Sequence, residues 1–220
     1  MLKLMLRLLM LVALSGAATL VRADALHDLV VATQVDNPQA VGKLLASGLG
    51  PNSDDPVSGE PVLILALRED ASAVFNVLMA HKDIQIERTA PNGNRPLMMA
   101  AFKRNKRAVA LLLVKGAVVN HPGWTALHYA AAAGDDDITA LLLDHHAYID
   151  TETPSKLTPL MVAAREGQES TVKLLLQNGA DATLKNNEQI TAAQIAERAD
   201  KPRIADAINA HLSLRPFLNR

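Results

Sequence analysis

The side chains best suited to chemistry in this chain are aspartates and histidines near its middle. The aspartate run at residues 135–137 is the strongest acidic cluster, and it lies between His121 and the adjacent pair His145 and His146. Imidazoles bind zinc and clustered carboxylates bind calcium, so one interpretation is a metal-dependent or enzymatic accessory protein. A calcium loop needs further oxygen ligands and a glycine turn, whereas aspartates at the start of a helix are favourable through the helix dipole alone. The pattern therefore favours a structural role, and we predict no metal site.

Other features exclude several classes of function. The chain has no cysteine, which excludes disulfides, thiolate metal sites and a cysteine nucleophile. It also has no Gly-rich phosphate loop, no His-Glu-x-x-His motif and no Gly-x-Ser-x-Gly motif. The net charge of −1 provides no attraction for nucleic acid, and the basic run at residues 103–107 has no interleaved aromatic side chains. We predict no catalytic residue, no cofactor and no nucleic-acid partner.

Most of the chain repeats one pattern with a period of 30 to 35 residues. In the clearest copies a turn position is followed first by a pair of small residues and then by a pair of large apolar residues. The turn positions are Asp28, Pro61, Pro96, Ala126, Pro159 and Ala192. Apolar residues make up 49% of the chain but aromatics only 3%, so Ala, Leu and Val must pack closely stacked helices. Self-similarity at this period is the signature of a solenoid.

The repeat unit resembles that of the ankyrin-repeat family. The family pattern of Thr-Pro-Leu-His, Ala-Ala, Gly, paired Leu and Gly-Ala is carried best by residues 125–147 and 158–180. Elsewhere it is weaker: Arg95 and Glu60 replace the threonine, and His81 replaces a glycine. The resemblance implies an all-α solenoid of about six helix-turn-helix repeats with short projecting hairpins. The expected domain is 24–220, with repeats at 24–53, 54–86, 87–119, 120–150, 151–183 and 184–214 and a short tail.

Each motif residue has a mechanical role in such a repeat. Pro159 fixes φ in the first helical turn, and Thr158 at the N-cap accepts a hydrogen bond from an amide that has no partner within the helix. In the family the histidine of the turn, here His128, braces adjacent turns by hydrogen bonds. The repeat register also places the acidic run 135–137 against the basic run 103–107 of the preceding repeat.

Residues 1–23 resemble a targeting segment. Two basic residues open the segment, residues 8–14 form an apolar core, and residues 21–23 form a small-residue cleavage signal. A retained membrane anchor is the alternative, but it needs about 20 consecutive apolar residues, and this run is interrupted earlier. We expect cleavage after Ala23 and a periplasmic or secreted protein. The bacterial periplasm is favoured, because an exported chain without disulfides suits it better than a eukaryotic secretory route.

The resemblance also implies where a partner would bind. In the family, partners contact hairpin tips and exposed first-helix residues on the concave face. The matching tips are Gly59, Asn94, Trp124, Leu157 and Ile190, and the helix positions are Ile64, Leu67, Met99, Phe102, Tyr129, Ala132, Val162, Arg165, Ile195 and Arg198. Methionine and aromatic residues, which are enriched at interfaces, form the predicted centre of the partner site: Met99, Phe102, Trp124 and Tyr129. Its predicted polar rim is Arg95, Arg165 and Glu166.

An alternative remains for the predicted centre, in which Met99 and Tyr129 pack between stacked helices and Trp124 covers a neighbouring hairpin. The predicted function is a non-catalytic, exported and monomeric module that binds another protein, with no stable membrane span after cleavage. The family resemblance permits inhibition or chaperoning of an exported enzyme, or immunity against a toxin delivered to the periplasm. The alternatives are the metal-dependent or enzymatic accessory protein, and a purely structural role in the envelope without a dedicated partner.

Overall fold

The computed structural model describes residues 23–218, with side chains described as far as residue 214. Within this part, residues 23–34 are helical and eleven further helices follow: α2 (Pro38–Ala46), α3 (Val62–Arg68), α4 (Ser72–Ala80), α5 (Pro96–Phe102), α6 (Lys106–Val114), α7 (Ala126–Ala133), α8 (Asp136–Asp144), α9 (Pro159–Glu166), α10 (Glu169–Gln177), α11 (Ala192–Arg198) and α12 (Pro202–Leu218). The predicted all-α class with about six paired repeats is confirmed. The predicted signal peptide lies outside the described residues, except for residue 23.

The helices form two compact units, one ending at Arg95 and the other beginning at Pro96. In the first unit, α3 pairs with α4 and α4 also contacts α2. Asp36 joins neighbouring repeats there, because its carboxylate accepts hydrogen bonds from the amides of Ala73 and Val74 at 3.2 and 2.8 Å. These amides lie in the first turn of α4 and have no acceptor within their own helix. None of the helices in the described part is long and apolar enough to cross a membrane.

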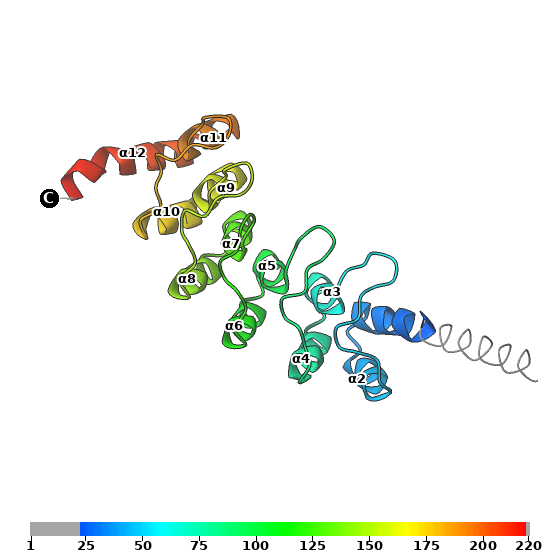
Figure 1. The fold of residues 1–220 in the computed structure, drawn as a ribbon. Coiled ribbons are helices and arrows are strands. Elements are labelled where there is room, and N and C mark those ends of the chain that lie inside the picture. Colours follow the sequence, from blue (N-terminus) through cyan, green and yellow to red (C-terminus); the bar gives the residue numbers. More distant parts are fainter. Residues whose placement is uncertain (1–22, 219–220) are drawn as a thin grey trace, which may run out of the picture. The chain divides into compact units, whose positions relative to one another are not determined.

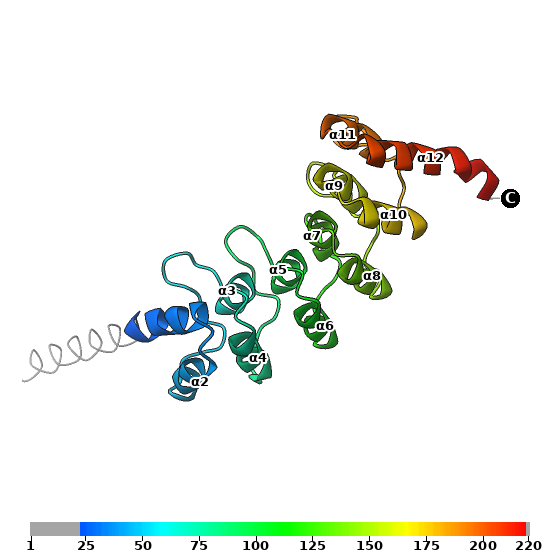
Figure 2. The ribbon, with the colours of Figure 1, turned by 180° about the vertical axis from the view of Figure 1, so that it is seen from behind.

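In the second unit the helices form two layers (Figures 1 and 2). The first helices of successive repeats, α5, α7, α9 and α11, contact one another in order, and the second helices, α6, α8, α10 and α12, do the same. Each helix in a repeat therefore packs against the equivalent helix about one period away. A single helix pair could not bury its apolar side alone.

The helix ends follow the predicted mechanics in the best-formed repeat. α9 begins at Pro159, and the Thr158 hydroxyl accepts a hydrogen bond from the amide of Met161 at 3.3 Å. Gly167 ends this helix in the left-handed conformation, with φ of 83°. Other repeats achieve the same break without glycine, at Asp36, Asp70, Arg104 and Asp200, which have φ between 48° and 58°. A sequence search for glycine alone therefore misses four of the six breaks.

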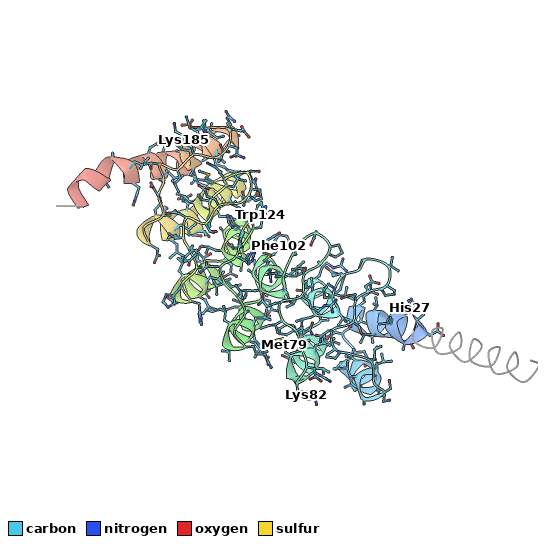
Figure 3. All side chains as sticks on the ribbon, in the orientation of Figure 1. His27, Met79, Lys82, Phe102, Trp124 and Lys185 are labelled. Atoms are coloured by element: carbon cyan, nitrogen blue, oxygen red, sulfur yellow. The ribbon has the colours of Figure 1, made fainter. Side chains whose placement is uncertain are left out.

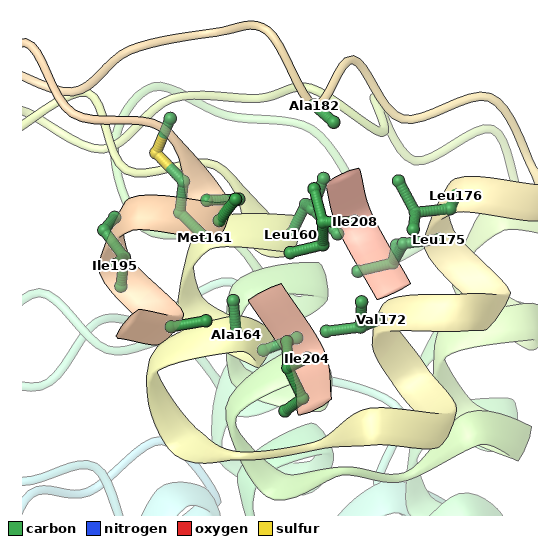
Figure 4. Packing of buried hydrophobic residues seen from close by; sticks show 14 of the residues in the cluster. Leu160, Met161, Ala164, Val172, Leu175, Leu176, Ala182, Ile195, Ile204 and Ile208 are labelled. Atoms are coloured by element: carbon green, nitrogen blue, oxygen red, sulfur yellow. The ribbon is translucent and has the colours of Figure 1, made fainter. Parts of the chain in front are cut away.

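The core of the second unit is built from small and aliphatic side chains. Figure 4 shows Leu160 and Ala164 of α9, Val172 and Leu175 of α10, and Ile208 of α12 meeting in one cluster. Each is fully buried. The alanines of the first helices, with almost no side chain beyond Cβ, allow the close approach that the composition predicts.

Candidate partner-binding face

The hairpin-side face is defined here as the first helices of the second unit together with the loops that precede α7, α9 and α11. Two of these loops are closed by a backbone hydrogen bond. The amide of Thr153 donates to the carbonyl of Leu157 at 3.0 Å, and that of Asn186 donates to the carbonyl of Ile190 at 3.1 Å. The loop before α7 is shorter by three residues and carries the sole tryptophan, Trp124. The tip side chains Trp124, Leu157 and Ile190 are all half-buried.

His128 ties the turn of α7 to the next hairpin. Its Nδ1 accepts from the amide of Thr125 at 3.2 Å, so Nε2 carries the proton and donates to the carbonyl of Leu157 at 2.9 Å. The imidazole is fully buried. Burial lowers the pKa of His128 from 6.5 to about 4, because the charged form would lose its hydration. The predicted bracing role is confirmed, and this histidine is a neutral structural group.

Three predicted aromatic residues form one cluster, named here the aromatic cluster: Phe102, Trp124 and Tyr129. The ring centroids of Phe102 and Tyr129 are 5.9 Å apart at an angle of 82°, and those of Trp124 and Tyr129 are 5.5 Å apart. Trp124 also lies 5.4 Å from the ring of His128. Phe102 and Trp124 both contact the ring of Tyr129, and Figure 3 labels them in adjacent repeats. The cluster spans α5, α7 and the short loop before α7, so it brings together side chains of two adjacent repeats.

The remaining predicted site residues are placed differently. Met99 lies half-buried on α5. Arg165 is exposed on α9, and its Nε donates to Glu166 at 2.9 Å. Arg95 ends the first unit, where its guanidinium pairs with Glu87 at 2.8 Å. Arg95 and Arg165 therefore belong to different units.

Four first-helix positions taken from the family pattern are not available to a partner. Ile64, Leu67 and Val162 are at most 1% exposed, and Ile195 is 6% exposed. The expectation that these positions lie open on the binding face is wrong. Large aliphatic side chains at these positions are buried in the repeat stack, whereas Tyr129 and Phe102 remain accessible.

A groove of about 540 Å³ lies on the hairpin-side face around α9 and α11. We name it the α9–α11 groove. Its apolar lining is Leu157, Ile190, Ile195 and Ala199, and its polar lining is Ser155, Arg165, Asn186, Asn187, Glu188 and Arg198. The repeat pattern placed several of these residues at the family's contact positions, but the predicted centre of the partner site was the aromatic residues. Arg165 was among the predicted rim residues. The missed signal was a second arginine, Arg198, at the equivalent position of the next repeat.

The acidic run has structural partners, as the repeat register predicted. Asp135 caps α8 by accepting from the amide of Ile138 at 3.0 Å and also lies 3.5 Å from Arg104. Asp137 pairs with Lys106 at 3.0 Å, across the boundary between repeats. In the described part of the chain, no group of three His, Asp or Glu residues is arranged to hold a metal ion. The run therefore helps to align α8 with α6.

Stacked helix pairs with projecting loops and a grooved face define a helical-repeat protein of the kind that binds other molecules along one face. Two overlapping stretches, residues 29–122 and 118–186, match the family described as ankyrin repeats in three copies. The chain belongs to the ankyrin-repeat family.

Known relatives share the repeats over most of this chain. Protein glp-1 of Caenorhabditis elegans is 32% identical over 174 residues, which cover 70% of this chain and 13% of that protein. The transient receptor potential cation channel subfamily A member 1 of Homo sapiens is 30% identical over 166 residues, which cover 70% of this chain and 14% of that protein. The SH3 and multiple ankyrin repeat domains protein 2 of Homo sapiens is 31% identical over 161 residues, which cover 71% of this chain and 9% of that protein. The chain thus spans less than a sixth of the length of these relatives.

Proposed function

We propose that this chain is a non-catalytic protein-binding module of the cell envelope that holds a partner protein against its hairpin-side face. The observation that carries the proposal is the aromatic cluster. Phe102 is 51% exposed, although the stack around it is built mainly from buried aliphatic residues. Trp, Tyr and Phe are enriched at protein interfaces, and Trp and Tyr are enriched among the residues that contribute most of the binding energy.

The chemistry of the described residues supports binding rather than catalysis. The buried histidine is neutral, and both of its ring nitrogens are hydrogen-bonded. In the acidic run, Asp135 caps α8, Asp136 accepts a hydrogen bond from Thr171 and Asp137 pairs with Lys106. Ankyrin repeats imply a protein–protein interaction module, which agrees with this arrangement. The proposed partner is therefore another protein.

Export is supported by the composition of residues 1–23. The lack of cysteine then favours a bacterial periplasm over a eukaryotic secretory route. An exported interaction module of this size suits an inhibitor, a chaperone or an immunity protein for an exported enzyme. Amino-terminal sequencing of the protein isolated from its own cells tests this part of the proposal. A mature chain that starts at Asp24 in the periplasm or medium supports export, and an intact chain in the cytoplasm contradicts it.

The binding face is tested by capturing partners from the envelope fraction with the wild type and with two variants, Phe102→Ala and Trp124→Ala. We expect each variant to weaken retention of a stoichiometric partner at least tenfold, since truncated hot spots cost about 2 kcal/mol or more. Lys173→Ala, on the exposed side of α10, is the matched control and should leave retention unchanged. If all three variants retained the partner as well as the wild type does, the assignment of the binding site to the hairpin-side face would be wrong.

A further inference from the structure

We propose that the α9–α11 groove binds an extended acidic segment of the partner, in which one large apolar side chain lies between two carboxylates. This inference rests on the proposed function and specifies the chemistry that one part of the face recognises. It concerns α9, α11 and their hairpins, whereas the aromatic cluster belongs to α5, α7 and the loop before α7.

The floor of the groove is apolar, and three of its four apolar residues are partly accessible. Leu157, Ile190 and Ala199 are half-buried, and Ile195 closes the floor at 6% exposure. The volume of about 540 Å³ falls within the range of about 300–1,000 Å³ typical of ligand sites. An aliphatic or aromatic side chain of the partner would bury itself and the accessible parts of Leu157, Ile190 and Ala199.

The walls of the groove are held in place before any partner arrives. Asn186 is 6% exposed, and its Oδ1 accepts from the amides of Glu188 and Ile190 at 2.9 and 3.2 Å. Asn187 ties two hairpins together, because its amide donates to the carbonyl of Ser155 at 3.1 Å and its side chain donates to the carbonyl of Pro154 at 3.2 Å. A site that is already ordered loses less entropy when a ligand binds.

The charges of the groove favour an acidic ligand. Two arginines and one glutamate are among its lining residues. Arg165 uses Nε for its contact with Glu166 at 2.9 Å, and Arg198 uses Nη1 for its contact with Glu188 at 2.7 Å. A guanidinium has five N–H donors, so both arginines keep donors for a carboxylate, which they can hold in bidentate geometry.

The spacing of the arginines sets the spacing of the acids. Arg165 on α9 and Arg198 on α11 occupy equivalent positions of adjacent repeats, and these two helices contact each other. Packed helices lie about 8–10 Å apart, and an extended peptide advances about 3.3 Å per residue. Two side-chain carboxylates two or three residues apart therefore match the two guanidinium groups.

Selection of random short peptides displayed on phage against the immobilised full chain tests the inference. We expect enrichment of sequences with two acidic residues two or three positions apart and an apolar residue between them. An enriched peptide is then titrated by fluorescence polarisation at low and high salt. Arg165→Glu and Arg198→Glu should each weaken binding about tenfold or more, whereas Glu188→Gln should strengthen it about twofold to tenfold, because it removes a competing carboxylate.

Arg107→Glu, in the first turn of α6, is the matched charge-reversal control and should bind like the wild type. Enrichment of basic or uncharged sequences, no enrichment, or unchanged affinity of Arg165→Glu would overturn the inference. If binding depends on Trp124 and Phe102 but not on Arg165 or Arg198, the proposed function stands and this inference fails. If the Phe102→Ala and Trp124→Ala variants also retain the native partner fully, the proposed face fails as well.

Discussion

Repeat four (α7 and α8) and repeat five (α9 and α10) share one backbone plan but bury different chemistry. Both have helices of 8 and 9 residues and end the first helix at a left-handed glycine. Where repeat four has the buried imidazole of His128, repeat five has the buried thioether of Met161. At the next position Tyr129 is half-buried, whereas Val162 is fully buried. The backbone plan therefore tolerates single changes, and those changes decide where a binding surface exists.

The largest expected difference between the two repeats is in the pH dependence of stability, to which the buried His128 contributes. Because burial lowers the pKa of His128 from 6.5 to about 4, the unfolded chain binds a proton in this pH interval that the folded chain excludes. The stability from the neutral ring is fully present above pH 6.5 and is lost as the pH falls toward 4. The expected total is about 3 kcal/mol, from 1.36 kcal/mol per pKa unit. Denaturant titrations across this range measure it.

Two variants separate the effect of His128 on acid stability from the effect of carboxylates that titrate in the same pH range. His128→Gln keeps an N–H donor but cannot gain a proton, so its stability should fall less steeply with acid than that of the wild type. His145→Gln, at an exposed position, should keep the wild-type slope. The same slope in His128→Gln and wild type would show that His128 is not excluded from protonation in the folded state.

The two left-handed glycines should differ in their response to alanine. A Cβ at Gly134 would lie 2.5 Å from Cδ of Gln168, whose Nε2 donates to the carbonyl of Ala132 at 3.0 Å. At Gly167 it would meet only the flexible end of Lys201, at 2.9 Å. We expect Gly134→Ala to cost about 2–3 kcal/mol and Gly167→Ala about 1–2 kcal/mol of unfolding free energy.

A Gln168→Ala background tests the cause of this difference, by the same thermal or denaturant unfolding measurements. In that background Gly134→Ala should cost about as much as Gly167→Ala, because the obstructing side chain is gone. If Gly134→Ala cost as much in the Gln168→Ala background as in the wild type, the Gln168 side chain would not be the cause of the larger cost.

The threonines before the two first helices should show a smaller contrast. Thr158→Ala removes one N-cap hydrogen bond and should cost about 1 kcal/mol. The Thr125 hydroxyl lies 3.0 Å from Nδ1 of His128, so Thr125→Ala should cost somewhat more, about 1–2 kcal/mol. Thermal unfolding of both variants measures this. If Thr125→Ala costs the same unfolding free energy in the wild type as in His128→Gln, the hydroxyl–imidazole contact contributes nothing.

The charged pairs should give the smallest effects. Lys106 and Asp137 join two repeats at 3.0 Å, whereas Lys173 and Glu169 lie within repeat five at 2.7 Å. All four side chains are exposed, so Lys106→Ala and Lys173→Ala should each change stability by no more than about 0.5 kcal/mol, and less in high salt. A cost above about 1 kcal/mol for Lys106→Ala alone would mean that charge holds the register between repeats.

Much of the fold was predictable because its signals are local. The small residues and leucine pairs at fixed spacing predicted the helix pairs, and Pro159 with Thr158 predicted the start of α9. The same spacing correctly placed the acidic run of α8 beside the basic run of α6. The aromatic cluster was also predictable, since Phe102, Trp124 and Tyr129 occupy contact positions of the family pattern in adjacent repeats.

Burial and shape were less predictable. Val162 and Tyr129 occupy the same repeat position, yet one is fully buried and the other is half-buried. Left-handed Arg104 occupies a position where the family pattern has glycine. The α9–α11 groove depends on how two hairpins are tied together by Asn187, and no local pattern encodes that tie.

The sequence by itself determined the repeat unit, its period and its helix caps, because these depend on the conformational preferences of neighbouring residues. Stacking in the tertiary structure decided which first-helix side chains face a partner and where the α9–α11 groove opens. The physical reason is that each helix is covered by helices from adjacent repeats, so the exposure of a side chain is set by residues a whole period away.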